Sequence, residues 1–269
     1  MRLINRKPGR SGNLMLASLP FVLLIAAYLV ASHLRLEANP GDKLLPAPQS
    51  FVAAMQQMAL EADARTGQRL LWQDTWASLR RLLLGLGISS VIGLGFGVAI
   101  GTIPYLRASL APFVTVISMV PPLAILPVLF IVLGLGELSK VVLIVIGVAP
   151  FLMRDLALHV ESLPAEQIVK AQTLGASTWQ IVLRIVLPQS LPRLLDALRL
   201  SLGPAWLFLI AAEAIAATDG LGYRIFLVRR YLAMDIILPY VVWITLLAFL
   251  LDLLLRLGAR RLFPWSRAR

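Results

Sequence analysis

The chain has 269 residues, of which 59% are apolar before glycine is counted and only 14% are charged. Soluble domains hold about 45–50% apolar residues with glycine included and about 25% charged residues. A compact soluble fold could not bury so much apolar surface, so the composition excludes a soluble enzyme. The net charge of +11 would suggest nucleic acid in a soluble protein, and the lack of cysteine excludes disulfides and thiolate metal sites.

Six stretches of about 20 residues with few charges predict six transmembrane helices in an all-α integral membrane protein. The predicted spans are 14–34, 82–106, 108–133, 138–158, 194–218 and 236–256. The first span follows a basic segment, as the apolar core of a signal peptide does. Its apolar run is longer than that of a signal peptide, so we expect a retained helix.

Lysine and arginine beside the first and last spans predict that both termini lie in the cytoplasm. The transmembrane domain is then 14–258, with cytoplasmic tails 1–13 and 259–269. The positive net charge is thus explained by basic tails that lie beside anionic lipid at the cytoplasmic face. Nucleic acid is therefore not an expected partner. Some arginines near the outer side are expected to face protein or a water-filled vestibule instead: Arg80, Arg81, Arg224, Arg229 and Arg230.

The outer connection 37–77 contains two prolines followed by apolar residues at helical spacing. This spacing predicts a short amphipathic helix on the membrane surface, formed by Phe51, Val52, Met55, Met58 and Ala59. We expect an interfacial linker, and a role toward the solute is the alternative.

Small residues recur every four positions along the second span, at Gly85, Ser89, Gly93, Gly97 and Gly101. Such a row lets another helix approach closely, so we expect it to serve packing. The chain has no G-x-x-x-x-G-K-[ST] loop for phosphate, so ATP-driven work would require a partner that binds the nucleotide.

Prolines interrupt the third span at Pro112, Pro121, Pro122 and Pro127. Each interior proline removes a backbone hydrogen bond and clashes with the preceding turn, so we expect this helix to kink or open. Broken helices occur at membrane depth where protein or a water-filled cavity satisfies the freed carbonyls. Pro121, Pro122 and Pro127 are therefore candidates for a translocation path or gate, and a kink for packing is the alternative.

Glu213 lies toward the outer half of the fifth span, where a carboxylate is unfavourable unless it faces a cavity or a cation. Two roles remain open: a structural ion pair with an arginine of 224–230, or a part in gating or the solute path. His33 and His159 stand alone and are expected to be ordinary interfacial residues. No catalytic or metal-ligand pattern stands out, so neither catalytic residues nor a cofactor or metal site is expected.

The inner connection 159–192 predicts a helix that opens at Pro164. Gly175 is expected to end this helix, because glycine readily adopts the left-handed conformation of a C-terminal cap. Between them, Glu166 lies in the first turn, and the apolar residues Ile168, Ala171 and Leu174 follow helical spacing. The segment therefore begins as a short helix that leaves the membrane on the cytoplasmic side.

A second helix is predicted directly after this turn, because Ser177 and Gln180 have the spacing of a capping box. Pro188 and Pro192 are expected to stop the second helix before the fifth span. The two helices form an elbow, residues 164–187, that projects into the cytoplasm. Its small apolar tip suits a groove of another protein.

These motifs resemble the permease subunits of bacterial binding-protein-dependent ABC importers. Gly175 and the segment Ile185-x-Leu187-Pro188 match the second half of the family's "EAA" signature, with the spacing of that signature. The first half departs, because its Glu-Ala-Ala falls on Val169-Lys170-Ala171 and only the last alanine is kept. The resemblance implies a type I, MetI-like permease fold in which the elbow is a coupling helix.

The nitrate, sulfonate, taurine and bicarbonate branch of this family shows further similarity. Its motifs resemble the segments Val120-Pro-Pro-Leu-Ala124, Gly134-x-Gly136-Glu-x-Ser139-Lys140 and Ala211-Ala-Glu213-x-Ile215-Ala-Ala-Thr218-x-Gly220-Leu-Gly222. Cargo of this branch includes nitrate, taurine and other sulfonates, which we expect first. Bicarbonate, cyanate, urea-like compounds and heterocyclic vitamin precursors are alternative solutes.

The resemblance further implies a non-catalytic permease of the bacterial inner membrane that works by alternating access. Its partners would be an ABC ATPase dimer that binds ATP and Mg, a second permease copy and a periplasmic binding protein. The implied contacts with the ATPase are Lys170, Ala171, Gln172, Thr173, Leu174, Gly175, Ala176, Ser177, Trp179, Leu187 and Pro188. The rival class is an ion-coupled secondary transporter or a channel, whose usual repeats and midplane ionisable residues do not stand out.

Overall fold

The computed structural model describes residues 9–63 and 67–267 of the chain. Its fold is 85% helical, and the described residues contain no strand, which confirms the all-α class. The chain divides into two compact units. The first is Met1–Arg69 with Val228–Pro239, and the second is Leu70–Leu227 with Tyr240–Arg269.

The first unit contains α1 (Arg10–Ala38) and α2 (Pro48–Leu60). The hydroxyl of Tyr28 donates a hydrogen bond of 2.7 Å to the carbonyl of Pro46, and its ring lies 5.7 Å from that of Phe51. These contacts fix the turn between the two helices. The helix predicted around residues 51–59 is confirmed, and the unit also holds η3 (Arg229–Tyr231) and the start of α11 (Met234–Leu262).

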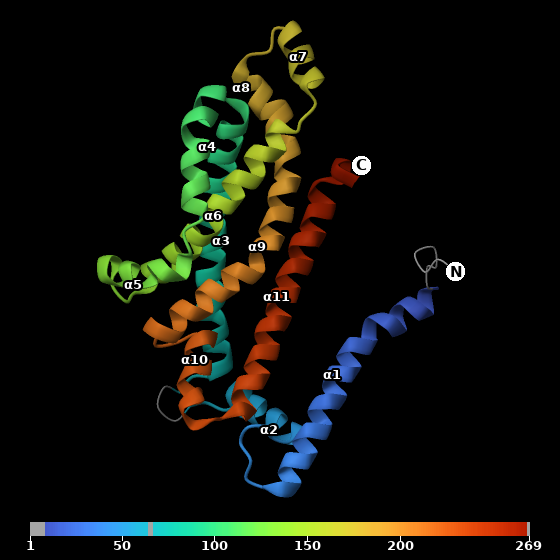
Figure 1. Cartoon of the computed structure of the whole chain (residues 1–269), viewed down its shortest axis with the longest axis vertical. Helices are drawn as coiled ribbons and strands as arrows, with labels where there is room; N and C mark the ends of the chain where they lie inside the picture. The colour runs from blue at the N-terminus through green and yellow to red at the C-terminus, as the bar shows by residue number, and fades with distance from the viewer. Residues whose placement is uncertain (1–8, 64–66, 268–269) are drawn as a thin grey trace. The chain divides into compact units, whose positions relative to one another are not determined.

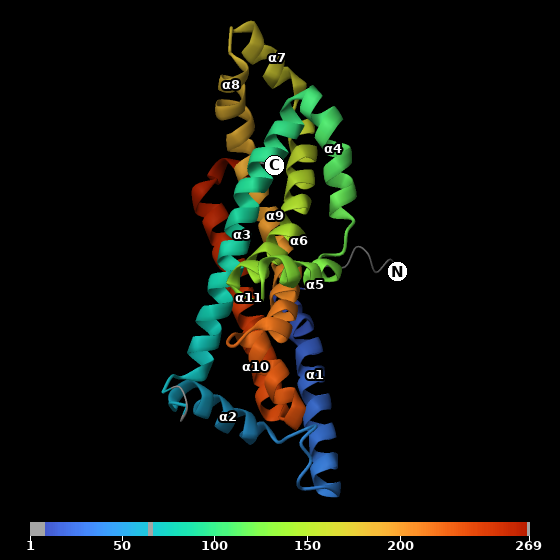
Figure 2. The ribbon, with the colours of Figure 1, turned by 90° about the vertical axis from the view of Figure 1, so that its left-hand side faces the viewer.

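The second unit is built on α3, α6 and α9, which pack side by side, with α4 against α3 and α6 (Figures 1 and 2). Its helices are α3 (Leu70–Thr102), α4 (Pro104–Ser118), α5 (Pro122–Leu133), α6 (Glu137–Glu161), α7 (Ala165–Thr173), α8 (Thr178–Ile181), η2 (Val182–Val186), α9 (Leu187–Ala216), α10 (Leu221–Val228), most of α11 and η4 (Pro264–Arg267). Both views show α7 and α8 projecting beyond the ends of α4 and α6.

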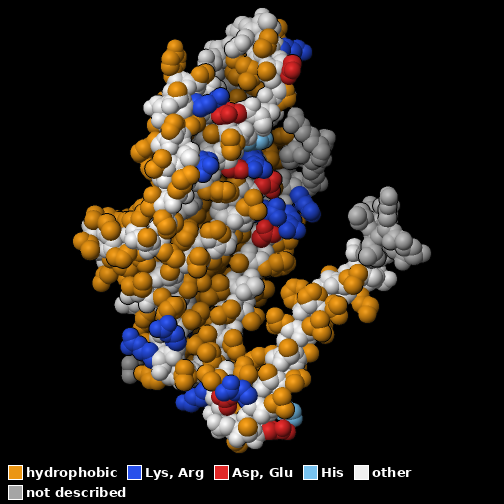
Figure 3. Space-filling model, viewed as in Figure 1, with side chains coloured by type: hydrophobic (Ala, Val, Ile, Leu, Met, Phe, Trp, Pro, Cys, Tyr) orange, Lys and Arg blue, Asp and Glu red, His pale blue; other side chains and the backbone are white. Residues whose placement is uncertain are grey.

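Within the described ranges, 5 helical stretches are long and apolar enough to cross a membrane, and the bent pair α4 and α5 makes 6 when counted as one span. This agrees with the six predicted spans. Figure 3 shows apolar side chains covering α5 and the middle of the second unit, whereas charged side chains gather nearer the elbow. The surface thus has an apolar region of the kind that lipid covers.

The predicted opening of the third span is confirmed. Helix α4 ends at Ser118, α5 begins at Pro122, and the two helix axes differ by 93°. Pro121 is the N-cap of α5 and Pro122 occupies its first turn, where a missing N–H leaves no hydrogen bond unmade. Pro112 and Pro127 lie inside α4 and α5 without ending them.

The second span begins at Leu70 instead of 82, so the outer connection predicted as 37–77 ends before this helix. The added turns stay helical because Asp74 and Ser78 are buried and hydrogen-bonded to other parts of the second unit. The predicted boundaries of the two tails, 13 and 259, also shift, because the first and last long helices extend beyond the predicted transmembrane domain. Helix α1 already begins at Arg10, and α11 continues to Leu262.

The prediction that Pro188 and Pro192 stop the elbow's second helix is wrong. Helix α8 continues through the π-helical turn η2 into α9, so the helical stretch runs from Thr178 to Ala216. In η2 the N–H of Leu187 donates to the carbonyl of Val182, five residues earlier. This wider turn directly precedes Pro188, and we attribute the continuity of the helix there to it, because proline has no N–H to donate.

The row of small residues on α3 packs against α6, as predicted. A Cβ added to Gly93 would lie 2.5 Å from Cβ of Leu152, and one added to Gly97 would lie 2.7 Å from Cβ of Leu156. Such distances are shorter than van der Waals contact. The two helices therefore approach more closely than side chains larger than hydrogen would allow.

Replacement of Gly93 by alanine should separate α3 from α6. We expect Gly93→Ala to lower the free energy of unfolding by about 1–3 kcal/mol, the usual effect of overpacking. Gly95→Ala is the matched control, because no atom lies within 4 Å of the added Cβ there. Chemical denaturation in detergent measures both, and equal midpoints would contradict this account of the row.

Candidate functional site

Arg81, on α3, is only 3% exposed and binds three carboxylates. Its Nε and Nη2 donate to Glu137 at 2.6 and 2.7 Å, Nη1 donates to Glu213 at 2.8 Å, and Nη2 donates to Asp219 at 2.5 Å. Lys140 donates to Glu137 as well, at 2.8 Å. These contacts join the beginning of α6 to the end of α9 through one guanidinium, whose planar donors suit several carboxylates at once.

Glu213 is fully buried and takes part in the ion pair that the sequence suggested, but with a different partner. Arg81 is the partner of Glu213 in this ion pair, whereas Arg224 pairs with Asp74 at 2.8 Å. Ser78 donates to Glu213 at 2.8 Å and completes its surroundings. The expectation of a partner among residues 224–230 is therefore wrong, because α3 extends further outward than predicted and brings Arg81 beside α9.

Three successive backbone N–H groups at the start of α10 are bound by side chains of α3 and α9. Gly220 donates to Asp74, Leu221 to Ser78 and Gly222 to Glu213, each at 2.9 Å. Gly220 has φ +116°, and a Cβ there would lie 2.6 Å from the carboxylate of Glu213. Only glycine fits this backbone conformation and this close approach.

Arg224, on α10, completes this end of the network. Burial alone would lower the pKa of Arg224, but the hydrogen bonds with Asp74 and the attraction of nearby charge together raise the pKa above its ordinary value. The guanidinium of Arg224 therefore stays charged. The hydroxyl of Tyr240 on α11 donates to the same carboxylate at 3.3 Å, so α11 also joins the network.

The broken helix contributes no hydrogen bond to this network within the described residues, although α5 packs against α6 and α9. The polar contacts of Glu213 come from Ser78, Arg81 and Gly222. At the end of α4, the hydroxyl of Ser118 accepts a hydrogen bond of 2.8 Å from Arg154 on α6. The candidate gate prolines Pro121, Pro122 and Pro127 thus belong to a neighbouring helix and not to the hydrogen bonds that hold Glu213.

The elbow has the local structure that the sequence predicts, and α7 begins at Ala165, one residue after Pro164. Gly175 has φ +79°, and its N–H donates to the carbonyl of Gln172 at 2.9 Å. The N–H of Ala176 donates to the carbonyl of Ala171 at 3.0 Å, which completes a Schellman motif.

The predicted capping box at the start of α8 is confirmed. The backbone N–H of Gln180 donates to Oγ of Ser177 at 3.3 Å, and the N–H of Ser177 donates to Oε1 of Gln180 at 2.8 Å. Two backbone N–H groups at the helix start are thereby satisfied. The turn between the two helices is therefore fixed on both sides, by the Schellman motif before it and by the box after it.

Most residues predicted to contact an ATPase lie together on this elbow. The three most exposed large apolar side chains there are Val169 at 55%, Leu174 at 79% and Trp179 at 69%. We call these three the apolar tip. Lys170 is exposed beside them, whereas Leu187 and Pro188 are half-buried at the beginning of α9 and do not belong to the tip.

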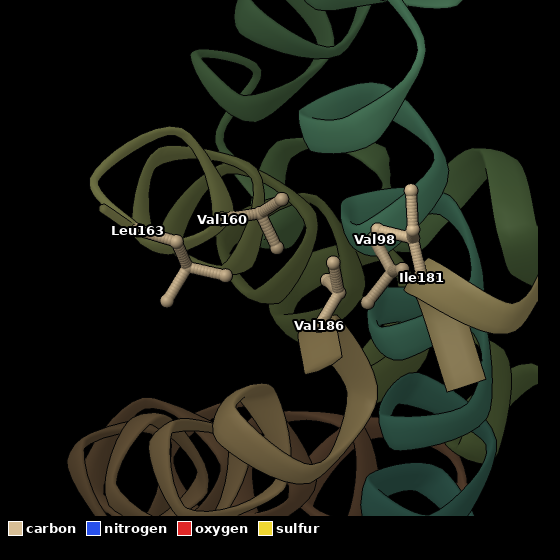
Figure 4. Packing of buried hydrophobic residues seen from close by; sticks show 5 residues of the cluster. All are labelled: Val98, Val160, Leu163, Ile181 and Val186. Carbon is tan, nitrogen blue, oxygen red and sulfur yellow. The ribbon is translucent and has the colours of Figure 1, made fainter. Parts of the chain in front are cut away.

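The elbow is attached to the rest of the second unit by a small apolar cluster, shown in Figure 4. Its buried residues are Val98, Val160, Leu163, Ile181 and Val186. Beside this cluster lies a cavity of about 460 Å³ between the turn that joins α3 to α4 and the two elbow helices. The elbow is therefore packed on part of its inner face only.

A family model described as a binding-protein-dependent transport system inner membrane component matches residues 90–266. The chain belongs to this family. Members of the family are permease subunits of ABC importers, so this chain is a non-catalytic permease whose ATPase is a separate partner. Both the family and its nitrate, sulfonate, taurine and bicarbonate branch are as the motifs indicated.

The taurine transport system permease protein TauC of Escherichia coli (strain K12) is 40% identical over 222 residues, 82% of this chain and 80% of that protein. The putative aliphatic sulfonates transport permease protein SsuC of Bacillus subtilis (strain 168) is 27% identical over 98% of this chain and 93% of its own length. The inward-facing structure of the MetNI methionine ABC transporter aligns with a TM-score of 0.64 and 22% identity, over 74% of this chain and 99% of that one. That likeness confirms the MetI-like fold.

Sequence reasoning missed Asp74 and Ser78, whereas Arg81 was among the arginines expected to face protein or a water-filled vestibule, and it does face protein. Asp74, Ser78 and Arg81 follow one another at i, i+4 and i+7, so they share one face of the helix. Polar residues at this spacing, next to an apolar span, were the available signal. It was overlooked because Asp74 was assigned to the outer connection 37–77 and the second span was expected to begin only at residue 82.

Removal of Arg81 should leave three carboxylates without their main partner. We expect Arg81→Met to lower the free energy of unfolding by about 3–5 kcal/mol, since breaking a buried ion pair leaves uncompensated charge. Arg80→Met is the matched control, because Arg80 is the next residue on the same helix and is exposed. Unfolding in detergent, followed by tryptophan fluorescence, measures both variants. A loss of equal size in the two would contradict the central role of Arg81.

Proposed function

We propose that this permease imports taurine or another small sulfonate. The observation that carries the proposal is the 40% identity to a taurine permease over most of the chain, and the aliphatic sulfonates permease supports the same class of solute. A binding protein outside the membrane delivers the solute to a pair of permease subunits. Nitrate, the other oxyanion expected from the sequence, becomes a comparison solute in the test.

The elbow of this permease docks on a partner ATPase. Its apolar tip is exposed at the predicted cytoplasmic side, and a surface of this kind binds an apolar groove of another protein. ATP and Mg are held by the ATPase dimer. With both termini in the cytoplasm, the elbow faces the compartment that contains ATP.

Closure of the ATPase dimer moves the elbow, and the membrane helices rock between inward-open and outward-open states. The broken pair α4 and α5 offers backbone that can line the solute path, since Pro121 and Pro122 leave the helix open there. The Arg81 network keeps the outer ends of α3, α6 and α9 together during this motion. The free energy of the cycle comes from the ATPase, and the permease converts it into movement.

The proposal is tested in proteoliposomes that contain the permease, its ATPase and its binding protein. Binding protein saturated with taurine should stimulate ATP hydrolysis and drive taurine uptake. Binding protein offered nitrate or bicarbonate should do neither. Taurine uptake that persists without the ATPase would overturn the importer mechanism, and stimulation by nitrate alone would overturn the assignment of the solute.

Introduction of a charge into the apolar tip should uncouple the complex. We expect Leu174→Asp to reduce taurine-dependent ATP hydrolysis roughly tenfold, as the loss of a central apolar contact does at interfaces. Gly175→Pro should act likewise, because proline cannot adopt the positive φ of this turn. Leu60→Asp is the control, since Leu60 is 65% exposed at the end of α2. Normal coupling in Leu174→Asp would show that the docking surface lies elsewhere.

A further inference from the structure

Gln189 makes contacts with both parts of the coupling segment. It lies at the beginning of α9, and its Nε2 donates to Oε1 of Gln167 on α7 at 3.0 Å. The same amide donates to the carbonyl of Ile185 in the π-helical turn, also at 3.0 Å. Both N–H groups of this side chain are therefore used, one for each element.

The carbonyl of Ile185 lies where the backbone pattern changes from π-helical to α-helical. The side-chain amide of Gln189 donates to this carbonyl, one residue before the end of the π-helical turn. Gln189 thereby stabilises the irregular turn as well as the position of α7.

His159, near the end of α6, adds a third element. Its Nε2 lies 3.1 Å from the backbone carbonyl of Gln189. A carbonyl oxygen only accepts hydrogen bonds, so Nε2 carries the proton and donates. We call Gln167, Gln189 and His159 the polar strap, because these three residues connect α7, α9 and α6 in one chain of hydrogen bonds.

Apolar contacts attach α7 as well. Helix α7 has no buried residue, but its half-buried Ile168 and Ala171 pack against the buried apolar cluster. Gln172 and Thr178 of the two elbow helices border the cavity of about 460 Å³. Side-chain hydrogen bonds from α7 to the membrane helices, within the described residues, come from Gln167.

We propose that Gln189 is a positioning residue that transmits movement of the elbow to α9 and α6. The polar strap pulls on the beginning of α9 when α7 is displaced, and the cavity gives α7 room for that displacement. This inference rests on the proposed docking of the elbow. It adds that the polar strap works beside the apolar cluster and the continuous helix from α8 to α9, so that its loss weakens the transmission of movement without abolishing it.

The test compares coupling with docking in reconstituted proteoliposomes that hold the permease, its ATPase and its taurine-saturated binding protein. The measured quantities are taurine molecules imported per ATP hydrolysed and the affinity of the ATPase for the permease. Gln189→Leu and Gln167→Leu should each lower the import ratio roughly fivefold, because the loss of one hydrogen bond usually changes an equilibrium by about this factor. ATPase affinity should stay unchanged, since neither residue belongs to the apolar tip.

Glu166→Leu is the matched control, because Glu166 is the exposed neighbour of Gln167 on the same helix and belongs neither to the polar strap nor to the predicted ATPase contacts. Its import ratio should equal that of the wild type. The double variant of Gln167 and Gln189 should be no worse than either single variant, because both remove one shared contact. Gln167 lies on an exposed helix, so its replacement keeps the test valid should Gln189→Leu fail to fold.

An unchanged import ratio in Gln167→Leu would overturn the proposal, and so would a loss of equal size in Glu166→Leu. Additive losses in the double variant would show that the two glutamines do not act through each other. Failure of the proposed docking gives a different result. In that case Leu174→Asp retains full ATPase affinity, whatever the glutamine variants do.

Discussion

The buried guanidinium of Arg81 is the constraint on which the end of the second unit opposite the elbow depends. A cation at this depth is unfavourable unless carboxylates surround it, and a carboxylate such as Glu213 is equally unfavourable without its cation. Each group therefore requires the other, and both require the turn after α9 to close over them. Gly220 permits that closure, because a side chain there would collide with the carboxylate of Glu213.

The elbow end of the same unit is held in a different way. An apolar cluster of five buried residues and a few hydrogen bonds attach the elbow, which also borders a cavity. Ion pairs occur near this end as well, such as Arg107 with Glu161 and Arg193 with Asp155, but their side chains are partly exposed, whereas those of Arg81 and Glu213 are buried. This difference suits the proposed subunit, which would receive movement through its elbow and keep its opposite end together.

Local features were predictable from the sequence, because they depend on residues a few positions apart. The Schellman motif at Gly175 and the capping box at Ser177 are of this kind. The partner of Glu213 was not predictable, since Arg81 lies 132 positions away and only the fold brings them together. The effect of proline was predicted correctly at one place and wrongly at another. Pro121 and Pro122 separate two helices as expected, whereas Pro188 follows a wider turn that keeps its helix continuous.

The π-helical turn fixes the length of the coupling segment. A turn with bonds from residue i to i+5 holds one residue more than an α-helical turn. Loss of a single residue between Val182 and Val186 would return the segment to α-helix with little change in the direction of the elbow, because the wider turn already accommodates one extra residue. Loss of a residue from the α-helical part of α9 would instead rotate everything before it by about 100° about the helix axis, and the apolar tip would then face another direction. The π-helical turn is therefore the place in this helix where a deletion is tolerated best.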